Sequence, residues 1–238
     1  MPRRSRLAFR PMSKLSPFLA VLLVAFGLFV SACGGDDEES SGEDEESSLA
    51  AESPCETVEA PEPKEFDLDP PPAKPSAGDL TAVVDTSCGT FEIALDTKGS
   101  PKTAASFEYL ANEGVLDGTP FHRIVPGFVI QAGDPAGTGS GPGPGYSVDE
   151  PPPDDVAYTM GVVAMAKTEA EPPGRSGSQF FVVTGADAGL PPDYATAGEV
   201  TEGMDVVQTI ESFGDPASGG TGTPLDIVVI NSVTIEEG

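Results

Sequence analysis

The residues that can do chemistry are few, and one segment holds most of them. Residues 121–134 read FHRIVPGFVIQAGD and contain the only histidine of the chain, His122, beside Arg123. One histidine cannot form a multi-histidine metal site, and it can supply only one member of a His-dependent hydrolase triad. Because neither a second histidine nor a well-placed nucleophile accompanies His122, we expect no hydrolase, no metal and no cofactor.

A second candidate for chemistry is the glycine-rich stretch GTGSGPGPG at residues 137–145. Phosphate-binding loops of the GxGxxG type need a third glycine and a following helix. Here Pro142, Pro144 and Tyr146 occupy the three positions where that last glycine would fall, and no helical pattern follows. We therefore interpret this stretch as a flexible loop and not as a phosphate site.

The charge of the chain excludes another class of function. Acidic residues number 39 against 12 basic residues, a formal net charge of −27. Five of the basic residues lie within the first 14 positions, so the remainder is still more acidic. A surface of this sign repels phosphate backbones, and we expect no binding to nucleic acid.

Residues 1–32 have the pattern of an export signal. Five basic residues precede an uncharged apolar run at residues 18–30, which is shorter than the roughly 20 residues of a spanning helix. The tetrad Val30-Ser31-Ala32-Cys33 resembles the lipobox of bacterial lipoproteins, in which the cysteine is lipidated and becomes the mature N-terminus. This implies an extracytoplasmic protein anchored to the cell membrane through Cys33. The alternative is an ordinary secretory signal followed by a chance cysteine.

Two extensions separate this signal from the folded part. Residues 33–53 are acidic and nearly free of apolar side chains, which predicts a disordered tether. Residues 54–78 contain seven prolines, which predict an extended arm. In an exported protein the two remaining thiols, Cys55 and Cys88, are candidates for a disulfide worth about 3.5 kcal/mol, although two unpaired thiols remain an alternative.

Residues 79–238 carry the patterns of a folded domain. Residues 80–86 and 90–95 are rich in β-forming residues and flank Ser87-Cys88-Gly89, which predicts a hairpin. We expect further strands at residues 121–125, 128–132, 161–166, 179–183 and 196–200, and one or two strands within 224–235.

Two helices are expected among these strands. The first begins at Ser100-Pro101, ends at Gly114, and places on one face Ala104, Phe107, Leu110 and Ala111. The second covers residues 202–211. About eight strands and two helices indicate an all-β barrel or sandwich that carries helices, and the pattern alone does not choose between them.

Residues 121–134 resemble the signature of the cyclophilins, a family of peptidyl-prolyl cis-trans isomerases. A second block, Met165-Ala166 followed by Gly177-Ser-Gln-Phe-Phe181, is similar to the family's other active-site strand, in the same order along the chain. The resemblance covers roughly residues 79–237. It implies a mainly β fold, an eight-stranded antiparallel barrel capped by two α-helices.

The resemblance also implies which residues act. Arg123, Phe128 and Gln131 match the catalytic positions, and the positions that match substrate-binding residues are His122, Met165, Ala166, Gln179, Phe181, Leu190 and Tyr194. For His122 a purely structural role is the alternative. In the implied reaction an X–Pro bond rotates over a barrier of roughly 18–20 kcal/mol. Arg123 donates to the prolyl nitrogen of the twisted amide, and no covalent intermediate is needed.

Four positions depart from the family pattern. Gly189 stands where many relatives have tryptophan, Tyr194 where the pocket histidine is expected, Ala197 where phenylalanine is expected, and Lys167 where asparagine is common. We expect Ala197 to form a wall of the proline pocket and to remove apolar area from it, with either weaker substrate binding or filling of the space by a neighbour such as Tyr194 as the consequence.

The expected function is prolyl isomerisation that assists the folding of exported proteins. The alternatives are a weakly active or inactive module that holds proline-containing segments, and an acidic structural lipoprotein with no affinity for prolyl peptides. Arg123, Phe128 and Gln131 together favour the enzyme, whereas Ala197 favours the binding module. The expected partners are proline-containing unfolded or exported polypeptides and, through the lipid, the membrane; we expect a monomer.

Overall fold

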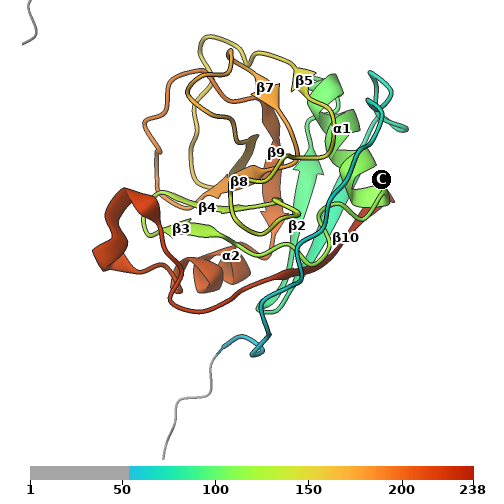
Figure 1. The fold of residues 1–238 in the computed structure, drawn as a ribbon. Helices are drawn as coiled ribbons and strands as arrows, with labels where there is room; N and C mark the ends of the chain where they lie inside the picture. Colours follow the sequence, from blue (N-terminus) through green and yellow to red (C-terminus); the bar gives the residue numbers. More distant parts are fainter. Residues whose placement is uncertain (1–53) are drawn as a thin grey trace, which may run out of the picture. The chain divides into compact units, whose positions relative to one another are not determined.

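One curled antiparallel sheet dominates the computed structural model, which describes residues 54–238 (Figure 1). Its strands lie side by side in the order β10-β1-β2-β9-β6-β8-β4-β3. Their bounds are β1 (Leu80–Thr86), β2 (Gly89–Leu95), β3 (Arg123–Val125), β4 (Val129–Ala132), β6 (Val162–Met165), β8 (Phe180–Val183), β9 (Thr196–Glu202) and β10 (Ile230–Glu237). The mainly β fold with eight antiparallel strands is therefore confirmed.

The predicted signal peptide (residues 1–32), the lipidation of Cys33 and the acidic tether (residues 33–53) lie outside the described residues. Within residues 54–238, no helix combines the length and the apolar character needed to cross a membrane.

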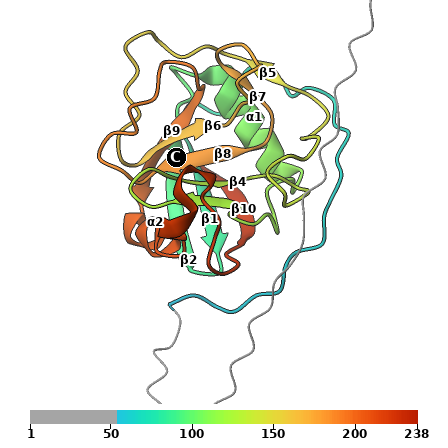
Figure 2. The ribbon, with the colours of Figure 1, turned by 60° about the vertical axis from the view of Figure 1, so that its left-hand side comes forward.

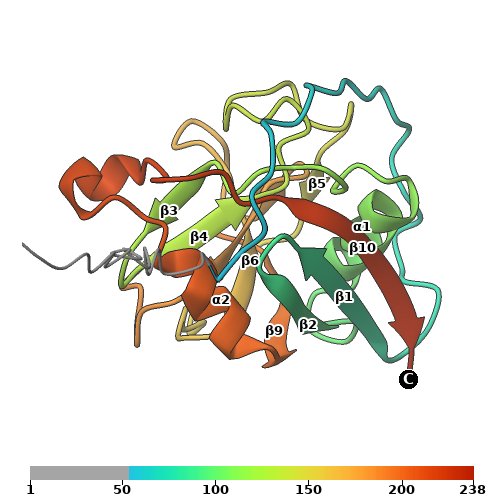
Figure 3. The same cartoon turned by 90° about the horizontal axis from the view of Figure 1, so that it is seen from below.

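The sheet, seen from below in Figure 3, is curled, and the segments that lead into its two edge strands, β3 and β10, are in contact. The contact forms where the chain enters β3 and β10. The Phe121 N–H donates to the Val228 carbonyl at 2.9 Å, and the Ile230 N–H donates to the Thr119 carbonyl at 2.9 Å. These bonds join the segment before β3 to the start of β10, and they cover part of the edge that the sheet would otherwise expose.

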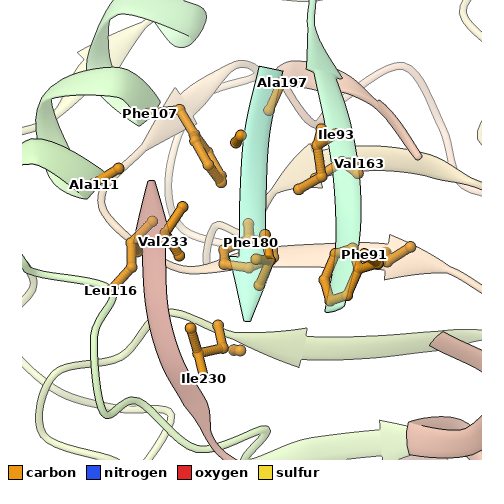
Figure 4. Close-up of a cluster of buried hydrophobic side chains, with 14 of the residues drawn as sticks. Phe91, Ile93, Phe107, Ala111, Leu116, Val163, Phe180, Ala197, Ile230 and Val233 are labelled. Carbon is orange, nitrogen blue, oxygen red and sulfur yellow. The ribbon is translucent and has the colours of Figure 1, made fainter. Parts of the chain in front are cut away.

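Successive residues of each strand point to opposite faces of the sheet, and both faces carry apolar side chains. The inner face forms the main core, part of which is drawn in Figure 4. Phe180 of β8 lies there against Phe107 of α1 (Pro101–Asn112), with ring centroids 5.3 Å apart in an edge-on arrangement. α2 (Met204–Glu211) adds Val207 and Ile210. The two helices cover different sides of the barrel (Figure 2).

The first helix follows the prediction at both ends but is capped differently. It starts at Pro101, and Gly114 after it has a φ of +66°, a conformation that favours glycine. The Ser100 side chain makes no capping bond. Instead a carboxylate oxygen of Glu150 accepts from both the N–H and the hydroxyl of Thr103, each at 2.7 Å.

Other boundaries differ from the prediction. α2 begins two residues later than expected because β9 continues to Glu202 and Gly203 turns the chain with a φ of +75°. The last strand begins at Ile230, since residues 224–229 make only isolated bridges. Three short elements were not predicted: β5 (Val148–Asp149), β7 (Arg175–Ser176) and the 3-10 segment η1 (Pro216–Thr221).

The proline-rich arm, residues 54–78, contains no helix or strand, as predicted. The expected disulfide is present: Cys55 is bonded to Cys88, and their Cα atoms lie 4.1 Å apart. Cys88 occupies the tight turn between β1 and β2, where Thr86 pairs with Gly89. The disulfide thus attaches the start of the arm to the first hairpin of the barrel.

Candidate active site

A row of side chains crosses the outer face of the sheet. Arg123 in β3 is paired in register with Gln131 in β4, and Gln131 is paired with Phe181 in β8. Side chains directly opposite one another in antiparallel strands have Cβ atoms about 4.5–5.5 Å apart. The sheet register therefore brings a guanidinium, an amide and an aromatic ring together from segments that are far apart in the sequence.

This row forms part of a pocket of about 270 Å³. Its lining combines aromatic and aliphatic side chains with a few polar ones. The lining residues are Arg123, Phe128, Val129, Gln131, Ala166, Lys167, Phe181, Leu190 and Tyr194. A few polar groups beside an apolar wall are typical of a small-ligand site.

Hydrogen bonds to Gly220 and Gln131 hold the Arg123 guanidinium in place. Its Nε and Nη2 donate to the Gly220 carbonyl of η1 at 3.3 and 3.1 Å, and its Nη1 donates to the side-chain oxygen Oε1 of Gln131 at 3.5 Å. Its Cζ lies 5.6 Å from the centre of the Phe128 ring. Since a guanidinium has five N–H groups, two have no partner within residues 54–238. Burial lowers the pKa of Arg123, but an arginine in a protein stays protonated.

Tyr194, at the pocket wall, is fixed through both its backbone and its ring. The Tyr158 hydroxyl donates to the Tyr194 carbonyl at 2.6 Å and accepts from its N–H at 3.0 Å. The Tyr194 ring meets Phe181 edge-on, with centroids 5.5 Å apart. Lys167 Nζ lies 5.6 Å from the centre of the same ring and pairs with Asp193 at 2.8 Å.

A second, larger pocket of about 500 Å³ adjoins the first, and the two share Gln131, Ala166 and Lys167. The glycine-rich loop, residues 137–145, forms one of its walls. The loop is anchored from inside by Asp134, a fully buried carboxylate that accepts four backbone N–H groups, from Ala136, Thr138, Gly139 and Gly141. These bonds lower the pKa of Asp134, although burial alone would raise it.

Most of the residues predicted for the site come together. Arg123, Phe128, Gln131, Ala166, Phe181, Leu190 and Tyr194 all line the smaller pocket. Gln179 lines the larger pocket and accepts a bond of 3.0 Å from the Gln131 amide. Val129 and Lys167 also line the smaller pocket; Val129 was not predicted from the sequence, and Lys167 was named only as a departure from the family pattern.

Three residues lie elsewhere. Met165 is fully buried in the main core and lines neither pocket. Ala197 is also fully buried in that core, so the expectation that it forms a pocket wall is wrong. His122 lines neither pocket and lies against Gly139, and its pKa is lowered by burial, an effect that the Asp134 carboxylate opposes.

Residues 81–235 match the family model described as cyclophilin type peptidyl-prolyl cis-trans isomerase/CLD. The chain belongs to this family. It is a peptidyl-prolyl cis-trans isomerase.

Named relatives agree with this membership. The chain is 37% identical over 171 residues to peptidyl-prolyl cis-trans isomerase A of Mycobacterium tuberculosis, covering 65% of this chain and 91% of that protein. It is 36% identical over 178 residues to isomerase B of Streptomyces anulatus, covering 67% and 98%. A crystal structure of a Cryptosporidium parvum cyclophilin has a TM-score of 0.61 and 28% identity, covering 68% of this chain and 99% of that one.

Proposed function

We propose that this cyclophilin rotates X–Pro bonds of exported polypeptides, assists their folding, and is held at the outside of the membrane by a lipid on Cys33. The main observation in support of the isomerase step is the position of the Arg123 guanidinium, which lines the smaller pocket. The Gly220 carbonyl holds it in place, and two of its N–H groups have no partner within residues 54–238.

The pocket suits rotation about a prolyl bond. Phe128, Phe181 and Leu190 provide apolar surface against which a proline ring packs while the preceding carbonyl swings. In the twisted amide the prolyl nitrogen becomes pyramidal, and its lone pair can accept a hydrogen bond. A donation from Arg123 to this nitrogen exists only in the twisted state, so it lowers the barrier without tightening binding of the planar amide.

The Arg123→Ala variant tests this step. Spontaneous X–Pro exchange takes tens to hundreds of seconds, and a preorganised donor is worth about 2.7–4 kcal/mol. We expect kcat/KM for a prolyl peptide to fall by about 10²–10³-fold, with an unchanged unfolding curve. Arg175→Ala is the matched control, because Arg175 pairs with Asp149 and lines neither pocket.

Two results would contradict the step. If Arg123→Ala keeps full activity, Arg123 does not stabilise the twisted amide. If the unaltered chain binds prolyl peptides without accelerating their exchange, the protein is a holding module and not an enzyme.

Two independent features support export and lipid attachment. The N-terminal pattern of basic residues, apolar run and Val30-Ser31-Ala32-Cys33 is typical of a lipoprotein signal. The Cys55–Cys88 disulfide fits an oxidising compartment, since cytosolic thiols are usually kept reduced. Both features support the proposal that the clients of the enzyme are polypeptides outside the cytoplasm.

Mass spectrometry of membrane-extracted protein tests the anchor. We expect residues 1–32 to be absent and acyl mass to be attached to Cys33, and we expect Cys33→Ser to release the protein from the membrane fraction. An intact N-terminus, or an unlipidated protein in the medium, would contradict the anchor and leave the isomerase step untouched.

A further inference from the structure

The proline-rich arm is bound along the barrel and is not a free linker. The Cys55–Cys88 disulfide fixes its start, and the Glu56 N–H donates to the Ser87 carbonyl at 2.7 Å. Near its other end, the Ser76 N–H donates to a carboxylate oxygen of Glu108 at 2.9 Å. Figure 2 shows the arm, in cyan and teal, passing along the outside of the domain.

The middle of the arm, residues 64–68, is bonded to the chain just before the glycine-rich loop and to the end of the loop. The Lys64 N–H donates to the Pro135 carbonyl at 2.9 Å, and the Leu68 N–H donates to the Pro144 carbonyl at 2.8 Å. The Lys64 ammonium also donates to the Asp117 carbonyl at 2.9 Å. Phe66 and Leu68 are half-buried against the main core.

The backbones of arm and loop are in direct contact at Gly145. A Cβ atom on Gly145 would lie 2.7 Å from the Leu68 nitrogen and 2.8 Å from the Asp67 Cα, and its φ is +100°. Only glycine fits such an approach. The loop is therefore enclosed between Asp134 on its inner side and residues 64–68 of the arm on its outer side.

The same loop is a wall of the larger pocket, which joins the proline pocket through Gln131, Ala166 and Lys167. A peptide whose proline occupies the smaller pocket and whose chain continues into the larger pocket runs past the loop. A segment with five glycines loses much conformational entropy when it is ordered. Where the arm already fixes the loop, a substrate does not have to order it on binding.

We propose that residues 64–68 are positioning residues of the substrate groove: they hold the glycine-rich loop in place as the wall that contacts residues flanking the proline. The arm lies outside residues 81–235, which match the family model, so this chain adds its own support to a groove that the family barrel provides. The inference rests on the proposed function, because it takes the two pockets as the binding groove of a prolyl peptide.

Leu68→Pro in the full chain tests the proposal, since it removes the N–H that bonds to Pro144. Two probes are compared: a four-residue peptide with one X–Pro bond, and a ten-residue peptide with the same bond at its centre. We expect KM for the long peptide to rise about fivefold, the size of one lost hydrogen bond, with kcat unchanged. The short peptide should keep its wild-type kcat/KM.

Glu62→Pro is the matched control, because it places a proline in the same arm at an exposed residue whose N–H makes no backbone bond to the barrel. If Leu68→Pro does not fold, Phe66→Ala replaces it and removes apolar packing from the same segment. Unchanged values for both peptides, or equal losses for both, would overturn the proposal.

Amide hydrogen exchange gives a readout that is independent of turnover. We expect the Gly139 and Gly141 amides, which donate to Asp134, to exchange faster in Leu68→Pro than in Glu62→Pro, and equal rates would also overturn the proposal. If the unaltered chain does not accelerate exchange of the short peptide, the proposed function fails, while the hydrogen-exchange comparison still decides whether the arm fixes the loop.

Discussion

Lys167 is an unusual residue for the wall of an apolar pocket, because its side chain is only 3% exposed. An ammonium removed from water needs compensating partners. Its Nζ has three: an Asp193 carboxylate oxygen at 2.8 Å, the Glu171 carbonyl at 3.1 Å and the Thr168 carbonyl at 3.3 Å. Asp193 precedes Tyr194, so this ion pair fastens the chain segment that presents the Tyr194 ring to the pocket.

Asp193→Asn should therefore weaken the fold and the pocket together. Loss of the carboxylate leaves a buried ammonium with carbonyl and amide partners only, and we expect the free energy of unfolding in urea to fall by about 1–3 kcal/mol. The double variant Lys167→Met/Asp193→Asn should recover most of this loss, because the buried charge is gone.

Lys98→Met is the control for losing a lysine ion pair. Lys98 and Asp79 are 82% and 75% exposed, so their contact contributes little. If the double variant is less stable than Asp193→Asn alone, the ion pair does not explain why the segment is ordered.

The two faces of each strand explain which site residues could be predicted. A motif identifies a segment, but alternation decides which of its residues face the pocket. In β4 the pocket side takes Val129 and Gln131, while Ile130 joins the core. In β6 the same rule sends Met165 to the core and leaves Ala166, just beyond the strand, to line the pocket. The motif match alone did not show on which face of the sheet each of these side chains would lie.

At the scale of elements, long patterned segments were predictable and short ones were not. The hairpin of β1 and β2 was recognised because two runs rich in β-forming residues flank the turn residues Ser87-Cys88-Gly89. β5 and β7 have two residues each, too few for any period, and they are fixed by pairing Val148 with Ser176 and Asp149 with Arg175. η1, whose Gly220 carbonyl holds Arg123, is a local turn without apolar spacing.

The disulfide between the arm and the hairpin gives a prediction at this scale. Cys55→Ser/Cys88→Ser should lower the free energy of unfolding by up to about 3.5 kcal/mol, because the unfolded chain loses a closed loop with a sequence separation of 33. Urea unfolding measures this. Activity on a short prolyl peptide should remain, since neither cysteine lines a pocket.

The reducing agent dithiothreitol supplies the matching control. It should destabilise the unaltered protein by a similar amount and leave the double variant unchanged. Equal stability of oxidised and reduced protein would show that the disulfide adds nothing to the other contacts of the arm.

At the scale of the whole molecule, charge is the dominant property. Beyond the first 14 residues, 39 carboxylates face only seven basic side chains. Of these seven, Arg123 and Lys167 line the proline pocket, where Lys167 is already paired with Asp193. A peptide therefore approaches a negative molecule before it meets the local positive charge of Arg123. The long-range field favours cationic peptides, whereas the local contact with Arg123 favours anionic ones.

Salt dependence of catalysis separates these two contributions. We compare two peptides with the same X–Pro bond, one with lysines and one with glutamates at its ends, far from the bond. At low ionic strength kcat/KM should be about tenfold higher for the cationic peptide, because the negative field raises its encounter rate. At 0.5 M salt the two values should converge to within about twofold, since the Debye length is then well below 10 Å. A neutral peptide should show little change and controls for salt effects on the fold. If instead the anionic peptide is preferred at low salt, the charge of Arg123 outweighs the molecular field, and the acidic surface does not select the clients of this isomerase.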